Sequence, residues 1–185
     1  MNLTVDTFSV IFLTIVLGIA TITDLRVHKI PNLLTFPAMA VALIYHCANR
    51  GLYGFSASAI GLVLGMAIFV IPYVMGGMGA GDAKLMGVVG AILGPEKLVV
   101  SSLFVAICGG IYALFIFSLN YKYTKYFINK TVFTIKHYIL TRKIIKISSE
   151  YEYKKPELYY AIPIVVGTLF ALLTYHFELN VFYFI

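Results

Sequence analysis

Apolar runs of near-membrane length, joined by short connections, follow one another along almost the whole sequence. The six runs are Val5–Thr23, Pro31–Ala48, Ala57–Met75, Ala83–Gly94, Leu98–Leu119 and Tyr159–Phe177. A helix needs about 20 mainly apolar residues to cross a bilayer. Only 12% of the 185 residues are charged, against roughly 25% in a soluble domain. We therefore predict an all-α integral membrane protein with six transmembrane helices, forming a single polytopic domain over residues 1–185.

The fourth run is too short for a full crossing. At about 1.5 Å per residue, the helix expected at Ala83–Gly94 cannot span a hydrocarbon core of about 30 Å. One of its ends is therefore expected to be recessed. Small residues let helices approach closely in a membrane, so we expect tight packing at the glycines of the third and fourth runs: Gly61, Gly65, Gly87, Gly90 and Gly94.

Basic residues set the predicted orientation. With six crossings, the connections that follow the first, third and fifth runs lie on the same side of the membrane. All 14 Lys and Arg residues except Arg50 and Lys97 belong to these connections. Because cytoplasmic connections carry the excess of Lys and Arg, this side is expected to be cytoplasmic and both termini to lie outside.

Two acidic residues remain without an obvious solvated position. Asp24 ends the first run and Asp82 opens the fourth, both on the predicted cytoplasmic face. Two carboxyls held close together share one proton, so one can activate water while the other donates a proton. Alternatively, each caps a helix N-terminus or pairs with a basic residue nearby. In a different class of protein, a small transporter or scaffold, the same two acids would be proton or cation sites.

Two motifs resemble those of one peptidase family. The segment "GGMGAGDAKLM", residues 76–86, and the upstream "TDLRVHKIPNLLTFP", residues 23–37, are similar to the GxGD and Asp…Ile-Pro-Asn motifs of the type IV prepilin peptidases. These are GxGD aspartic proteases of the membrane. The resemblance extends from Thr21 to about Pro95, and the rest of the chain fits by its pattern of spans.

The resemblance implies an aspartic endopeptidase of the cytoplasmic (inner) membrane that removes the leader from prepilin-like subunits at the cytoplasmic face. Asp24 and Asp82 would be its catalytic pair, and Gly79 and Gly81 would shape the loop that holds Asp82. Lys84 matches the lysine of the motif, where it could tune Asp82 or meet a lipid phosphate. The Ile-Pro-Asn segment, residues 30–32, is sufficiently explained as the start of the second run. The substrate would be a prepilin with a hydrophobic N-terminal helix, and no cofactor or metal is expected.

Two departures narrow the resemblance. Larger members of the family carry a cytosolic insertion with two CxxC pairs, whereas Cys47 and Cys108 are far apart. The chain is thus similar to the compact members that serve tight-adherence, or Flp-type, pilus systems. An archaeal preflagellin peptidase is the alternative within the same group. No pattern typical of S-adenosylmethionine binding is visible, so N-methylation is not carried over.

The long connection between the fifth and sixth runs, Asn120–Leu158, is basic and amphipathic. Ile128, Val132, Ile135 and Ile139 recur at helical spacing among lysines. We predict a helix in the headgroup layer of anionic lipid, with docking to pilus assembly machinery as an alternative. Nucleic acid is not expected as a partner of a polytopic membrane protein.

Overall fold

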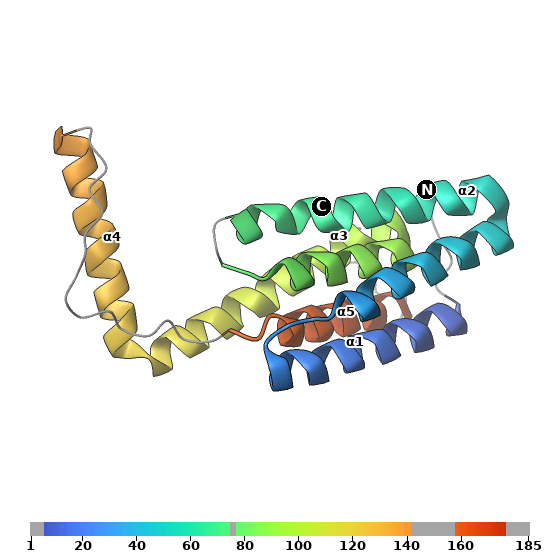
Figure 1. Cartoon of the computed structure of the whole chain (residues 1–185), viewed down its shortest axis with the longest axis horizontal. Coiled ribbons are helices and arrows are strands. Elements are labelled where there is room, and N and C mark those ends of the chain that lie inside the picture. Colours follow the sequence, from blue (N-terminus) through green and yellow to red (C-terminus); the bar gives the residue numbers. More distant parts are fainter. Residues whose placement is uncertain (1–5, 75–76, 142–157, 177–185) are drawn as a thin grey trace. The chain divides into compact units, whose positions relative to one another are not determined.

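The computed structural model describes residues 6–74, 77–141 and 158–176. In these ranges the chain is helical without strands, and the helices are α1 (Thr7–Val27), α2 (Asn32–Val74), α3 (Ala80–Leu119), α4 (Tyr121–Thr141) and α5 (Ala161–His176) (Figure 1). The chain forms two compact units, Met1–Gly109 with Tyr159–Ile185 and, separately, Gly110–Leu158. The all-α prediction is confirmed, and all the candidate site residues lie in the first unit.

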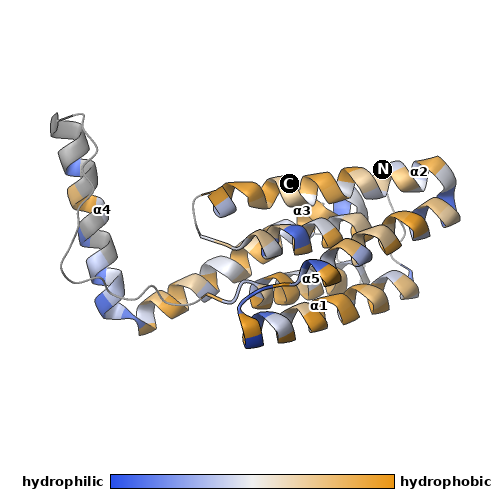
Figure 2. Cartoon of the chain, viewed as in Figure 1, coloured by the Kyte–Doolittle hydropathy of each residue, from blue (hydrophilic) through white to orange (hydrophobic). Residues whose placement is uncertain are grey.

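Helices α1, α2 and α3 are each long and apolar enough to cross a membrane. On α1, Ile11, Ile15, Ile19 and Ile22 repeat at helical spacing and are each between 43% and 54% exposed. Figure 2 shows the same apolar character along the helices of the first unit, with polar residues gathered at helix ends. An exposed apolar surface of this extent is what lipid contact requires. The chain is a membrane protein, and the number of six crossings stays a prediction.

Two glycines divide the long helices. Gly51 breaks α2 with φ 61° and ψ −147°, and Gly94 breaks α3 with φ 78° and ψ 170°. Both have a positive φ, which glycine adopts at little cost because it has no Cβ. The second and third runs are joined without a loop, because helix continues on both sides of Gly51 and the kink needs only that residue. The fourth run ends at Gly94 as predicted.

The first segment of α3, before Gly94, is the central helix of the first unit. Every residue from Leu85 to Gly94 is buried, which explains why this segment is apolar on all sides. Its glycines meet the second half of α2: a Cβ on Gly61 would lie 2.1 Å from the Gly90 carbonyl oxygen, and one on Gly65 would lie 2.3 Å from that of Met86. The predicted close packing is therefore confirmed.

The break at Gly94 removes hydrogen-bond partners from the last carbonyls of this segment. The Ser58 hydroxyl donates to the Ala91 carbonyl at 2.7 Å, and His46 Nε2 lies 3.0 Å from the Ile92 carbonyl oxygen. Since a carbonyl only accepts, Nε2 carries the hydrogen. Both side chains come from α2 and are buried, so α2 terminates the central helix as well as packing against it.

Part of the predicted amphipathic connection is helical. Helix α4 covers Tyr121–Thr141, while residues 142–157 lie outside the described residues. At its start, the Thr124 hydroxyl donates to the Phe117 carbonyl at 2.6 Å, and the Tyr123 and Phe117 rings stack. The helix is confirmed, and its contact with lipid headgroups stays a prediction.

Candidate active site

Asp82 lies in the first turn of α3, where it accepts a hydrogen bond from the chain that precedes it. The Gly79 N–H donates to Asp82 Oδ2 at 2.9 Å, and the Asp82 N–H donates to the Gly79 carbonyl at 3.2 Å. A carboxylate at the third helical position that bonds back to the residue before the helix is half of a capping box. Asp82 is only 7% exposed, so these bonds fix a carboxyl that is largely shielded from solvent.

Asp24 lies in the last turn of α1 and caps a different helix. The N–H of Ala161, the first residue of α5, donates to Asp24 Oδ2 at 3.3 Å. Helices α1 and α5 lie side by side (Figure 1), which brings this pair together across 137 residues of sequence. Asp24 is 8% exposed, so it too is largely shielded from solvent.

The two aspartates meet at one end of the first unit. The charge of Asp24 is one of the groups that act on Asp82, and like charges repel when both are ionised. Each also faces the N-terminus of a helix, where backbone N–H groups favour negative charge. Helix capping is therefore confirmed for both residues, and their juxtaposition is what a proton-sharing pair needs. Their catalytic role stays a prediction.

The glycines beside Asp82 pack tightly against their neighbours. A Cβ on Gly81 would lie 3.0 Å from the Ile30 Cβ and 3.3 Å from the Ile30 carbonyl oxygen. A Cβ on Gly79 would lie 3.2 Å from Asp82 Oδ2. Neither glycine has a positive φ, so close approach, rather than backbone conformation, explains the residue type.

Lys84 contacts the start of α2 and not Asp82. Its Nζ donates to Asn32 Oδ1 at 2.7 Å and lies 5.1 Å from the centre of the Phe36 ring. Within the described residues, no ion pair joins Lys84 to either aspartate. The expectation that Lys84 tunes Asp82 directly thus finds no contact to support it, because two residues along a helix turn the side chain to the opposite face.

Comparison with known families adds to this geometry. Residues 11–114, more than half of the chain, match the model of the type IV leader peptidase family. The chain belongs to this family. The matched region contains both aspartates, Gly79, Gly81 and Lys84. No curated protein and no solved structure matches significantly.

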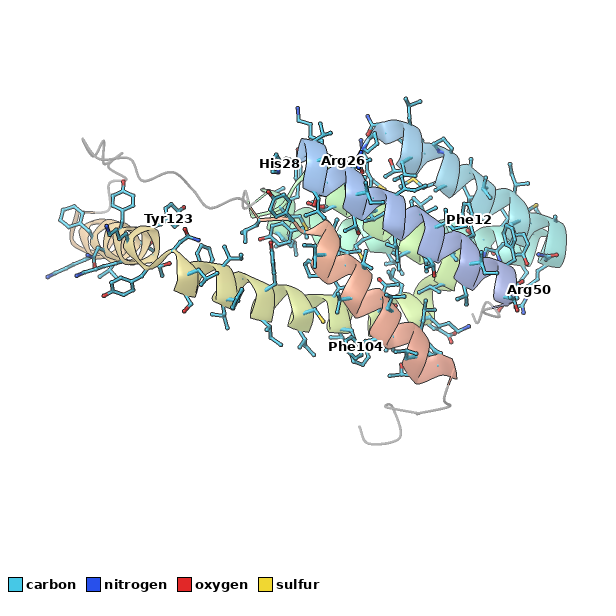
Figure 3. All side chains as sticks on the ribbon, turned by 90° about the horizontal axis from the view of Figure 1, so that it is seen from below. Phe12, Arg26, His28, Arg50, Phe104 and Tyr123 are labelled. Atoms are coloured by element: carbon cyan, nitrogen blue, oxygen red, sulfur yellow. The ribbon has the colours of Figure 1, made fainter. Side chains whose placement is uncertain are left out.

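The surface of the chain is hollowed at the turn between α1 and α2. The hollow has a volume of about 380 Å³ and is lined by Thr23, Val27, Lys29, Ile30, Pro31 and Asn32. Thr23 and Val27 belong to the last turns of α1, so the hollow lies at the end of the helix that carries Asp24, and neither aspartate is among the residues that line it. Figure 3 shows Arg26 and His28 at this end of α1 and Arg50 at the opposite end of the unit.

Sequence reasoning missed Ile30 and Asn32 as site residues. Both belong to the Ile-Pro-Asn segment that was assigned only to the start of a helix, yet Ile30 packs against Gly81 and Asn32 binds Lys84. The available signal was that Asn32 and Lys84 are polar residues of the two motifs that carry the family resemblance. As to metals, the described residues include no group of three or more His, Cys, Asp or Glu side chains that could hold an ion.

Proposed function

We propose that this leader peptidase is a membrane-embedded aspartic endopeptidase that cleaves the leader from prepilin-like subunits of the Flp, or tight-adherence, type. Membership of the type IV leader peptidase family supports peptide cleavage. The observation that carries the aspartic mechanism is the pair of largely buried carboxyls, Asp24 and Asp82, which interact at one end of the helix bundle.

In the proposed mechanism, the two carboxyls hold one proton between them. The ionised carboxyl takes a proton from water as the water oxygen attacks the scissile carbonyl carbon, while the protonated carboxyl donates to the carbonyl oxygen. Collapse of the tetrahedral intermediate breaks the C–N bond, and the leaving amine takes a proton from the pair. Gly79 and Ala161 each donate to one carboxyl oxygen; we assign the other oxygen of each carboxyl to water or substrate.

We further propose that the site faces the cytoplasm from the inner membrane. The basic connections support this orientation. The helix ends also support it: on the side of the carboxyl pair lie the end of α1, both ends of α2 and the starts of α3 and α5. The hydrophobic N-terminal helix of the substrate would lie in lipid beside the unit, and the extended leader junction would enter the hollow next to Asp24.

The decisive experiment combines purified protein in detergent with a prepilin-like substrate and identifies the new N-terminus by mass spectrometry. Asp24→Asn and Asp82→Asn should each lower cleavage by about 10³-fold or more, since an amide cannot exchange the proton. Asp6→Asn is the matched control, because Asp6 also caps a helix by accepting from the Ser9 N–H at 2.9 Å. Asp6 lies at the N-terminal end of α1, away from the pair, so the Asp6→Asn variant should cleave the substrate as fast as the wild type.

Near wild-type cleavage by either Asp24→Asn or Asp82→Asn refutes the aspartic pair. A wild-type protein that inserts, folds and leaves several prepilins intact refutes the peptidase itself, and the transporter or scaffold alternative would then stand.

A further inference from the structure

The turn between α1 and α2 touches the start of α3 at two points. Ile30 is buried against Gly81, where an added Cβ would come within 3.0 Å of the Ile30 Cβ. Asn32 Oδ1 accepts from Lys84 Nζ at 2.7 Å. The two contacts join residues that are about 50 positions apart in sequence, and we call them together the Ile30–Asn32 clasp.

Within the clasp, Lys84 lies on the side of α3 opposite to Asp82. Successive residues of a helix are 100° apart, so Lys84 points about 200° away from Asp82. Its ammonium is held by two residues of the first turns of α2, Asn32 and Phe36. An ammonium that donates to an amide oxygen and lies near a ring face makes stronger contacts than a neutral group would.

The same turn is also tied to Asp24. The N–H of His28 donates to the Asp24 carbonyl at 2.9 Å, and His28 adopts a left-handed conformation with φ 53° that ends α1. Pro31 then fixes the chain as it enters α2. The stretch from Asp24 to Asn32 is therefore short and conformationally restricted, and it connects one carboxyl to the clasp.

We propose that Asn32 and Lys84 are positioning residues that, with Ile30 packed against Gly81, hold the start of α3 so that the Asp82 carboxyl faces Asp24. This inference rests on the proposed function for its catalytic consequence, but the contact itself does not. The clasp gives the Ile-Pro-Asn segment and the lysine of the second motif a common task, which is to join the two elements that carry the carboxyls.

Kinetics separate positioning from binding. Lys84 does not line the hollow proposed for the substrate, so Lys84→Met should lower kcat about tenfold to a hundredfold with KM unchanged. Asn32→Leu should lower kcat similarly, but because Asn32 also lines the hollow its KM does not discriminate; the double variant should lose no more kcat than the worse single variant. Asn32→Asp keeps an acceptor oxygen and Lys84→Arg keeps a cationic donor, so each variant should retain most of the wild-type kcat. Lys122→Met, an exposed lysine of α4, is the matched control and should equal the wild type.

Wild-type kcat in Lys84→Met overturns the proposal, and so does a double variant whose losses multiply. A loss confined to KM in Lys84→Met also overturns it, because that result assigns the lysine to substrate binding.

A disulfide tests the contact without any substrate. With Cys47 and Cys108 replaced by alanine, the pair Ile30→Cys and Gly81→Cys should form a disulfide under mild oxidant, because two Cβ atoms 3.0 Å apart need to separate by only about 0.5 Å to reach the 3.5–4.5 Å range of disulfides. The control pair, Ile30→Cys and Gly18→Cys, should stay reduced, since a Cβ on Gly18 meets nothing within 4 Å. Thiols that remain free are counted by their shift with a maleimide-linked polymer.

The two experiments distinguish the two proposals. If the cysteine variant cross-links but the wild-type protein cleaves no prepilin, the proposed function is refuted and the contact is confirmed. If the cysteine variant does not cross-link although the wild-type protein cleaves prepilin, only the clasp is refuted.

Discussion

Substituting Gly61 by alanine tests whether helix contact within the bundle controls the site. The new Cβ would lie 2.1 Å from the Gly90 carbonyl oxygen and 2.8 Å from its carbon. Both are backbone atoms, so no side-chain rotation relieves the overlap. Since non-bonded heavy atoms prefer about 3.5 Å or more, α2 and the central helix must separate by about 1 Å.

The magnitude follows from that displacement. Overpacking in a well-packed core costs about 1–3 kcal/mol, and a misplacement of about 1 Å lowers catalysis by about 10²-fold. Because Asp82 is carried by the same central helix, Gly61→Ala should both destabilise the fold and slow cleavage. Gly90→Ala should behave alike, since its Cβ would lie 2.1 Å from the Gly61 carbonyl oxygen.

The assay is unfolding of the purified protein in mixed micelles of increasing SDS content, with cleavage measured in parallel. Gly18→Ala is the matched control: it lies in α1 with nothing within 4 Å of the added Cβ, and loss of glycine's backbone entropy should stabilise it by up to about 1 kcal/mol. Equal stability and activity of Gly61→Ala and Gly18→Ala would refute the close contact between α2 and α3.

Two further outcomes are expected. Ser58→Ala should destabilise the protein by about 1–3 kcal/mol in the same unfolding assay, because the Ala91 carbonyl loses its side-chain donor inside the bundle. The control is Ser56→Ala: the Ser56 hydroxyl donates only locally, to the Tyr53 carbonyl, so its loss should change stability by less than about 0.5 kcal/mol. A cysteine at Lys29 and one at Leu52, in a background without Cys47 and Cys108, should react with a membrane-impermeant maleimide from opposite sides of sealed vesicles; labelling of both from the same side would rule out the proposed six crossings.

The sequence predicted the helices of the first unit well because their apolar runs and their ends carry local signals. The close-packed glycines and the short central segment also follow from local composition, and both are present in the structure. The continuation of helix through residues 49–56 does not follow from the apolar runs, which end at Ala48 and resume at Ala57. One positive φ at Gly51 is enough to divide the two helices.

The contacts of the site depend on pairs that are distant in sequence. Lys84 and Asn32 are separated by 52 positions, and Asp24 and Ala161 by 137. Residue type gives the capacity of each group to donate or accept, but not the partner. That is why the lysine of the second motif was assigned to Asp82 or to lipid, and why the asparagine of the first motif was assigned no partner.

In the proposed mechanism each aspartate has two tasks, since one carboxyl oxygen caps a helix and the other meets water or substrate, and this determines which substitutions are informative. Each carboxyl accepts from a backbone N–H at a helix start, from Ala161 or from Gly79. In lipid, an N–H without a partner costs several kcal/mol, so alanine at either position would remove the acid and expose a helix terminus at once. Asparagine keeps an acceptor oxygen and caps helices about as well as aspartate, but it cannot exchange a proton. A protein that folds with asparagine and cleaves nothing therefore isolates the acid chemistry, whereas loss of activity with alanine alone would be equally consistent with a purely structural aspartate.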